Sequence, residues 1–310
     1  MTINTVPLTL RPPVPEDAEK AFALVTRCET DDLGEAQLEW EEHLADWDDI
    51  APGSRWVVAT PDREIVGYAI LFTFGPGDNT LFAYVHPDFT GLGIGTRLLQ
   101  AAERRVNDIA PPEGPVYFRV NNPGGKPTAE RLFIEQGFHV KTHVFQMRIE
   151  MSAPPPTPAW PDDLKPRLLR SPAEDKIAWQ VIEDAFEQPG RVRRPFEAWH
   201  SRVFDSDAFD PALFFVVENP AGEIVAAIHC QNLEHDTNIA QVAVREDYRR
   251  RGIGLSLLYT VFGEVWRRGR RVVVLSVDGQ NPTNAISVYK RAGMSVKHHY
   301  IKWEKVIRAE

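Results

Sequence analysis

The segment RRRGIG at Arg249–Gly254 is the part of the chain whose residue types and spacing point most directly to chemistry. A weaker copy, TGLGIG, occupies Thr90–Gly95. Each copy follows a short apolar run and a turn, and each precedes a stretch with helical periodicity. A helix N-terminus presents unpaired N–H groups and the positive end of the helix dipole, and glycine lets the backbone approach an anion. Both segments therefore predict phosphate-binding turns.

The glycine spacing argues against two common phosphate-binding motifs. Gly91, Gly93 and Gly95 form G-x-G-x-G instead of G-x-G-x-x-G, and the loop follows several strands instead of the first strand of a βαβ unit. No G-K-[ST] follows either copy, which excludes a P-loop. A lone G-x-G also forms ordinary strand-to-helix turns, so the surrounding elements must decide its role.

The elements that would position these loops recur in the same order in both halves of the 310-residue chain. Each half is predicted to contain a strand, an amphipathic helix, a hairpin, the Gly loop with its helix, another strand, a closing helix and a final strand. Gly93 and Gly252 have the same separation as Gly95 and Gly254, which indicates a tandem repeat of one domain. The expected fold class is α/β (α+β mixed sheet), with two domains that each contain a mixed, mostly antiparallel sheet flanked by helices.

A proline-rich segment, Ser152–Pro166, separates the halves. Proline removes N–H donors and favours extended backbone, so this segment predicts a semi-rigid linker. The predicted domains are therefore residues 1–151 and 167–310, joined by residues 152–166.

The composition is that of a globular protein, with 43% hydrophobic and 25% charged residues. The formal net charge of −9 argues against a general nucleic-acid binder. Cys28 and Cys230 provide neither a disulfide framework nor zinc spacing, so no metal is expected. The N-terminal residues lack signal-peptide features and no run of about 20 apolar residues occurs, so we expect a cytoplasmic protein without a membrane partner. The oligomeric state is not indicated.

Two motifs of the C-terminal half resemble the GNAT N-acetyltransferase superfamily. Arg249-x-x-Gly252-x-Gly254 resembles its acyl-CoA pyrophosphate motif, and Asn281–Met294 resembles its closing helix with a tyrosine. The resemblance covers both halves in element order, and the tandem layout is similar to mycothiol synthase-like two-domain acetyltransferases. No residue pattern identifies mycothiol as the acceptor.

The resemblance implies acetyl-CoA, or another acyl-CoA, as cofactor. In the superfamily the strand before the loop separates from its neighbour, and its free backbone groups bind the pantetheine arm. Asn281 either contacts the cofactor or caps the helix. The implied cofactor-binding residues are Val242, Ala243, Val244, Arg249, Arg250, Arg251, Gly252, Ile253, Gly254, Leu255, Asn281 and Ala285.

The resemblance also implies that Tyr289 is the general acid that protonates the departing thiolate. The alternative is an amphipathic tyrosine that packs on the core. Relatives often carry the base on the strand before the loop, but here that strand reads Asn238–Gln241 and has no carboxylate. Glu234 is the base candidate, with Glu183, Glu187 and His229 as alternatives. Each of these residue types is also common on solvated surfaces or, for His229, in a hydrogen-bonded core.

The N-terminal half departs further from the family pattern. Thr90 replaces the arginine, and Phe133 replaces the tyrosine, so this half is expected to be non-catalytic. The segment Trp40–Trp47 predicts an amphipathic helix, or alternatively a wall of the substrate cleft. A second, vestigial cofactor site would comprise Ala83, Tyr84, Val85, Gly91, Gly93, Ile94 and Gly95.

The function expected from the resemblance is transfer of an acyl group, most simply acetyl, from acetyl-CoA to a primary amine of a small molecule. The amine would attack directly in a ternary complex. The alternative is a non-enzymatic acyl-CoA sensor or interaction module, since a fold alone does not fix function. A third option is transfer of another acyl group, such as succinyl or an aminoacyl unit.

Overall fold

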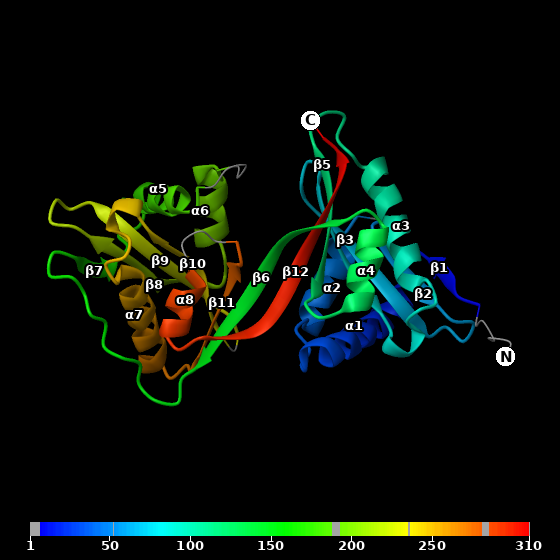
Figure 1. The fold of residues 1–310 in the computed structure, drawn as a ribbon, viewed down its shortest axis with the longest axis horizontal. Coiled ribbons are helices and arrows are strands. Elements are labelled where there is room, and N and C mark those ends of the chain that lie inside the picture. The colour runs from blue at the N-terminus through cyan, green and yellow to red at the C-terminus, as the bar shows by residue number, and fades with distance from the viewer. Residues whose placement is uncertain (1–6, 52, 188–192, 235, 281–284, 310) are drawn as a thin grey trace. The chain divides into compact units, whose positions relative to one another are not determined.

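The computed structural model describes residues 7–51, 53–187, 193–234, 236–280 and 285–309. The chain forms two compact units (Figure 1). Unit 1 comprises Met1–Val144 and His298–Glu310, and unit 2 comprises Phe145–Lys297. Each unit contains a mixed sheet with helices on both faces, as the sequence predicts.

In unit 1 the strand order is β1-β2-β3-β4-β5-β12, and β4 pairs with β5 in parallel. Alternate residues of β2 enter opposite cores: Val57 packs with α1, whereas Val58 packs with α3. The elements are β1 (Thr9–Arg11), α1 (Ala18–Leu33), α2 (Trp40–Asp49), β2 (Arg55–Ala59), β3 (Ile65–Gly75), β4 (Asp78–Val85), α3 (Ile94–Asp108), β5 (Val116–Pro123), α4 (Pro127–Glu135) and part of β12 (Ser295–Arg308).

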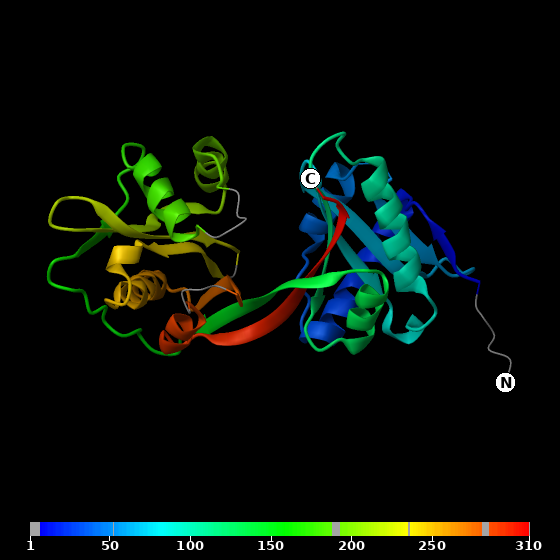
Figure 2. The same cartoon turned by 45° about the horizontal axis from the view of Figure 1, so that its top comes forward.

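Unit 2 repeats this plan with the order β6-β11-β10-β9-β8-β7, and β10 pairs with β11 in parallel. Figure 2 shows its helices on both sides of the sheet. The elements are part of β6 (His139–Glu150), β7 (Lys165–Leu168), α5 (Asp175–Ala185), α6 (Phe196–Phe204), β8 (Phe209–Glu218), β9 (Ile224–Asn232), β10 (Thr237–Val244), α7 (Ile253–Arg267), β11 (Val272–Asp278) and α8 (Ala285–Arg291).

The two cores of unit 2 lie on opposite faces of its sheet. One core contains Ile228 and Cys230 and is covered by α7 and α8, with Phe262 and Tyr289 among its members. The other core contains Ala227 and is covered by α5 and α6. This alternation along β9 is why the strand reads as a nearly continuous apolar run.

Each half of the sequence contributes its last strand to the other unit. Residues 300–308 of β12 pair antiparallel with β5 of unit 1, and Ile301 and Trp303 are buried there. The end of β6 belongs to unit 2, where Met147 is fully buried. The compact units therefore differ from the expected division at residues 151 and 167, because a local strand pattern does not specify which sheet the strand joins.

The proline-rich segment contains no helix or strand between residues 151 and 164, as expected for extended backbone. It packs on unit 2 instead of hanging free. The Met151 N–H donates to the Arg271 carbonyl, and the Ser256 hydroxyl donates to the Ala159 carbonyl at 2.7 Å. Trp160 packs against the core beneath α7.

Candidate active site

Strand β10 separates from its parallel neighbour β11 soon after the two begin to pair. Their pairing covers only Thr237 with Val273 and Asn238 with Val274. On its other side β10 stays paired with β9 as far as Val244, with a bulge between Ile239 and Gln241. The end of β10 therefore has one edge of backbone N–H and C=O groups without a strand partner. This is the separation expected at Val242, Ala243 and Val244.

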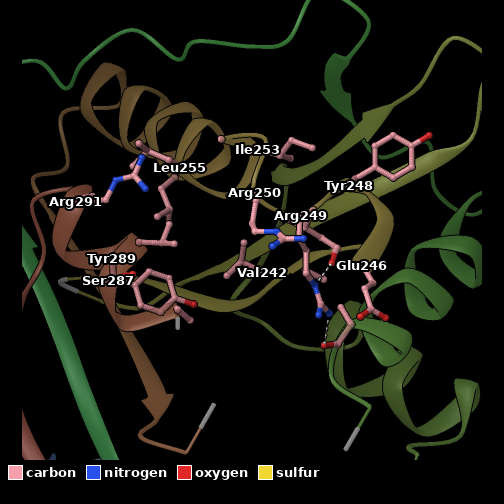
Figure 3. A pocket seen from close by; sticks show the side chains of 18 of the residues that line it. Val242, Glu246, Tyr248, Arg249, Arg250, Ile253, Leu255, Ser287, Tyr289 and Arg291 are labelled. Atoms are coloured by element: carbon pink, nitrogen blue, oxygen red, sulfur yellow. Dashed lines mark hydrogen bonds between the residues drawn. The ribbon is translucent and has the colours of Figure 1, made fainter. Parts of the chain in front are cut away.

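A cavity of about 720 Å³ opens at this separation (Figure 3). It is bounded by the end of α5, the end of β10, the Gly loop with the first turn of α7, and α8. Its lining residues are Ala185, Phe186, Glu187, Val242, Ala243, Val244, Glu246, Tyr248, Arg249, Arg250, Gly252, Ile253, Gly254, Leu255, Leu258, Ala285, Ser287, Val288, Tyr289 and Arg291.

The Gly loop begins α7 in the way that an anion site requires. Gly252 is the N-cap of α7 with φ 81°, in the left-handed region that favours glycine. No side chain caps this helix, so the first N–H groups remain available. Together with the helix dipole, these groups form an anion-binding position at the cavity.

The three arginines of RRRGIG have different partners. The Arg249 guanidinium donates to the carbonyls of Val244 at 3.2 Å and Ala185 at 3.3 Å, so it fastens the loop to β10 and α5. Arg251 pairs with Asp163 at 2.6 Å and does not belong to the residues that line the cavity. Within the described residues, Arg250 has no ion-pair partner, and it lines the cavity. Arg250 is therefore the arginine of the motif placed to meet a phosphate.

Arg291 lines the cavity, although its position in the sequence does not predict this. It lies in the last turn of α8 and is exposed at the cavity. A basic residue in the last turn of a helix is common because it complements the helix dipole. No sequence signal distinguishes Arg291 from such a residue.

Tyr289 lies on α8 with its side chain at the cavity. Figure 3 shows its hydroxyl directed toward the side where Val242 lies. The residue is only 8% exposed, and burial raises the pKa of the phenol to about 12. The ring also packs in the core beneath α7, so Tyr289 is both a core residue and a cavity residue. It remains protonated at neutral pH and can act only as a proton donor there.

The cavity fits the chemistry of an acyl-CoA. The N-terminus of α7, with Arg250 and Arg291, matches a pyrophosphate. The unpaired edge of β10 matches an arm that carries amide groups. Tyr289 lines the same cavity and supplies a hydroxyl that could donate a proton to a thiolate. Ala285 lines the cavity as expected, whereas Asn281 lies outside the described residues.

The base candidates lie in different surroundings. Glu234 is exposed in the turn between β9 and β10 and does not line the cavity, whereas Glu187 does. Glu183 is 1% exposed and accepts the Arg194 backbone N–H at 3.1 Å. His229 is 3% exposed, and burial lowers its pKa to about 4. Of these four residues, the structure brings only Glu187 to the cavity.

The N-terminal half retains the glycine turn, and several groups near it have protein partners. Gly93 is the N-cap of α3 with φ 73°, and β4 separates from β5 after Leu81. The Cys28 thiol donates to the Val85 carbonyl at 3.4 Å, and in unit 2 Arg249 donates to the equivalent Val244 carbonyl. The Tyr84 hydroxyl donates to Glu29 at 3.4 Å.

The first helix of unit 1 is longer than that of unit 2, and it is paired with α4. Helix α1 has 16 residues and α5 has 11, and an ion pair joins Asp32 near the end of α1 to Lys126 at the start of α4. A side chain at Gly95 would lie 3.0 Å from the Leu132 side chain. Phe133 packs against Phe138 and Trp303 in the core.

Helix α2 confirms the prediction that the segment Trp40–Trp47 forms an amphipathic helix. His43 and Trp47 face inward and are buried. The two rings contact each other and Tyr68 of β3. The His43 ring also lies 3.1 Å from the Ala18 carbonyl. This helix therefore covers one face of the unit 1 sheet.

A repeated mixed sheet, with a separated central strand, a glycine-capped helix and a tyrosine at one cavity, defines a tandem acyl-CoA-dependent transferase. Sequence models agree: the "Acetyltransferase (GNAT) family" matches residues 177–294, and an "Acetyltransferase (GNAT) domain" matches residues 52–140. The chain belongs to the GNAT acetyltransferase family. It is an acetyltransferase, and enzymes of this fold use acetyl-CoA as co-substrate.

Two curated relatives are named mycothiol acetyltransferase. The protein from Thermobispora bispora is 31% identical over 78% of this chain and 81% of its own length. The protein from Salinispora arenicola is 29% identical over 82% of each chain.

Two solved structures share the arrangement. A GCN5-related N-acetyltransferase from Sphaerobacter thermophilus is 34% identical with a TM-score of 0.87, over 98% of both chains. A tandem GNAT protein from the clavulanic acid biosynthesis pathway is 15% identical with a TM-score of 0.70, over 98% of this chain and 100% of its own. The second likeness concerns the fold alone.

Two kinds of feature are absent from the described part of the chain. No helix there is long and apolar enough to cross a bilayer. Nor do three or more histidine, cysteine, aspartate or glutamate side chains in that part gather in a way that would hold a metal ion.

Proposed function

We propose that the cavity of unit 2 transfers an acetyl group from acetyl-CoA to a primary amine of a small molecule. The observation that carries this proposal is the meeting of three features at one cavity: the free edge of β10, the N-terminus of α7 and the Tyr289 hydroxyl. The family relationship supports the reaction class. The assignment of roles to residues rests on the geometry of this chain.

Acetyl-CoA supplies an electrophilic thioester carbonyl. The N–H groups at the start of α7, with Arg250 and Arg291, bind its phosphates. The unpaired backbone of β10 holds the pantetheine arm, and the amine attacks directly in a ternary complex. Tyr289 donates its proton to the departing thiolate, and Glu187, which lines the cavity together with Glu246, takes up the amine proton.

We assign no catalysis to unit 1. Phe133 has no proton to donate, and its ring is in the core. In unit 1 the Val85 carbonyl accepts from Cys28, a side chain at Gly95 would contact Leu132, and Asp32 pairs with Lys126. Gly93 and Gly95 are then remnants of a cofactor turn that now serves as an ordinary helix start.

The direct test is release of free thiol from acetyl-CoA by the full chain with a panel of small primary amines. The panel includes mycothiol-related amines because the relatives are named mycothiol acetyltransferase. Succinyl-CoA in place of acetyl-CoA tests the acyl group. Tyr289→Phe is expected to lower kcat about 100-fold. It should change the Kd for acetyl-CoA less than twofold, because the ring and its packing remain.

The matched control is Tyr248→Phe, which removes another hydroxyl from the cavity lining. The Tyr248 hydroxyl accepts from the Asn219 side chain at 3.0 Å, so its loss should leave kcat within about twofold. An equal loss of kcat and of acetyl-CoA affinity in Tyr289→Phe would assign Tyr289 to binding alone.

The second candidate function is an acyl-CoA sensor. The observation that favours it is Gln241, an uncharged residue on the strand where relatives often carry a carboxylate. Tight acetyl-CoA binding without thiol release by any amine of the panel would support the sensor and contradict the proposed catalysis.

A further inference from the structure

Gln241 is the centre of a hydrogen-bonded chain on the α5–α6 face of unit 2. Its side-chain oxygen lies 2.9 Å from Nε1 of Trp199 and 2.8 Å from Nε2 of His229. Trp199 is fully buried and His229 is 3% exposed. Two side chains of the interior therefore meet one amide that is itself partly exposed.

Elementary donor chemistry fixes the orientation of all three groups. An indole N–H can only donate, so the Gln241 atom that faces Trp199 must be the amide oxygen. The same oxygen then accepts from His229, so the proton of that ring must be on Nε2. The remaining ring atom, Nδ1 of His229, is buried and has no hydrogen-bond partner in the structure.

The free end of Gln241 is consequently its NH₂ group. Both acceptor positions of the oxygen are occupied, and within the described residues the NH₂ group has no protein partner. The orientation of the Gln241 amide is fixed, because rotating it by 180° would place the NH₂ group against two N–H donors. With the proton on Nε2, Nδ1 of His229 stays buried without a hydrogen-bond partner, which lowers the stability of the folded unit.

Gln241 does not itself line the cavity; it precedes the lining residue Val242 and lies on the face of the sheet opposite Tyr289. Ala243, two residues further along β10 on the same face, lines the cavity, and so do Phe186 and Glu187 at the end of α5. Tyr289 belongs to the other core, beneath α7. The phosphate-binding turn and the proton donor are thus on one side of the strand separation, and Gln241 is on the other.

We propose that Gln241 is a specificity-determining residue whose NH₂ group donates to an oxygen of the acyl acceptor. The acceptor class is then a primary amine that carries a hydroxyl, carbonyl or carboxylate oxygen near the nitrogen. Trp199 and His229 are positioning residues that aim this donor. The inference rests on the proposed function for the identity of the ligand as an amine.

The test measures binding to the full chain saturated with CoA, so it does not depend on turnover. Two matched pairs of probes are titrated: glucosamine against cyclohexylamine, and glycinamide against propylamine. Within each pair, the readout is the ratio of the affinity for the oxygen-bearing amine to that for the oxygen-free amine. This ratio cancels any general attraction between a charged variant and an ammonium group.

Gln241→Glu is the key variant, since a carboxylate oxygen still accepts from Trp199 and His229 but offers no N–H donor. We expect at least one pair to show a ratio above about fivefold in the unchanged chain and a ratio near one in Gln241→Glu. Gln241→Met gives the same loss of ratio without a charge, and the affinity for CoA reports whether each variant is folded.

His229→Phe tests the positioning role. The phenyl ring keeps the contact with Phe214 but removes one of the two donors that orient the amide. The ratio should fall to an intermediate value, with CoA affinity unchanged. The inference is overturned if the ratio is the same in Gln241→Glu as in the unchanged chain, or if none of the four amines binds. If the unchanged chain shows the expected ratio of affinities but releases no thiol, the result contradicts the proposed catalysis and leaves the role of Gln241 in place.

Discussion

His229 couples the stability of unit 2 to pH. Burial is the largest cause of its lowered pKa of about 4; the hydrogen bond to Gln241 opposes this shift, and the charge of Arg202 adds to it. The ring is therefore neutral in the folded state at pH values where it is charged in the unfolded chain. Its contribution to stability is present above pH 6.5 and is lost as the pH falls from 6.5 to 4.

His229→Phe should remove this part of the pH dependence. The shift corresponds to about 3 kcal/mol of unfolding free energy between pH 7 and pH 4. Urea unfolding of the unchanged chain and of His229→Phe, each at pH 7 and at pH 4.5, measures this effect. The quantity compared is the change in unfolding free energy between the two pH values, not the absolute stability. An equal loss of stability on acidification in both proteins would show that His229 is charged or accessible in the folded state.

Residue type and spacing predicted part of the site. Gly252 and Tyr289 were singled out because the segments around them resemble family motifs, and both residues line the cavity. The role of Arg249 was not predictable, since its partners are backbone carbonyls that approach only in the folded unit. The Gln241 chain was missed for the same reason, because its members come from three separate elements.

Helices α3 and α7 begin in nearly the same way, which provides a matched experiment. Gly93 and Gly252 are N-caps with φ 73° and 81°, and neither position has an atom within 4 Å of an added Cβ. Alanine at either site pays a similar backbone cost of about 1 kcal/mol in unfolding free energy. Only Gly252→Ala should also weaken acetyl-CoA binding, by about tenfold, because only its turn faces the cavity.

Calorimetric titration of acetyl-CoA measures both the affinity and the number of sites. The unchanged chain and Gly93→Ala should each bind one equivalent with the same Kd. Two equivalents in the unchanged chain, with one lost in Gly93→Ala, would establish that unit 1 binds the cofactor.

The order of elements was predictable because its signals are local. Turn residues mark the hairpins, and glycine followed by a periodic apolar stretch marks α3 and α7. The contact between α1 and α4 in unit 1 was not predictable, since it depends on five additional helical residues in α1 and on an ion pair with the start of α4. Their effect appears only when the helices are packed.

The strand exchange makes each unit depend on distant sequence. Ile301 and Trp303 of β12 are buried in the core of unit 1, and the Trp303 indole donates to Asn122 at 2.7 Å. A chain that ends after Lys297 should therefore lose stability in unit 1, although the deletion lies in the other half of the sequence. The loss of these two side chains alone is worth at least about 3 kcal/mol.

Hydrogen exchange read by peptide locates the effect. Protection should fall first in β5 and in the α3–α4 face of unit 1. Trp303→Ala should reproduce much of this change, whereas Lys302→Ala, at an exposed neighbouring position, should not. Loss of protection confined to residues 145–297 would contradict the exchange. No sequence pattern specifies this pairing, because the open edges of both sheets accept an antiparallel strand.

The strand exchange also determines when unit 1 can be completed during synthesis. The ribosome synthesises β5 well before β12. The edge of β5 therefore has no antiparallel partner while nearly all of unit 2 is synthesised. During that interval unit 1 exposes an apolar strand edge that is prone to wrong pairing. Unit 1 is thus completed only by residues 300–308, which are synthesised after residues 145–297 of unit 2.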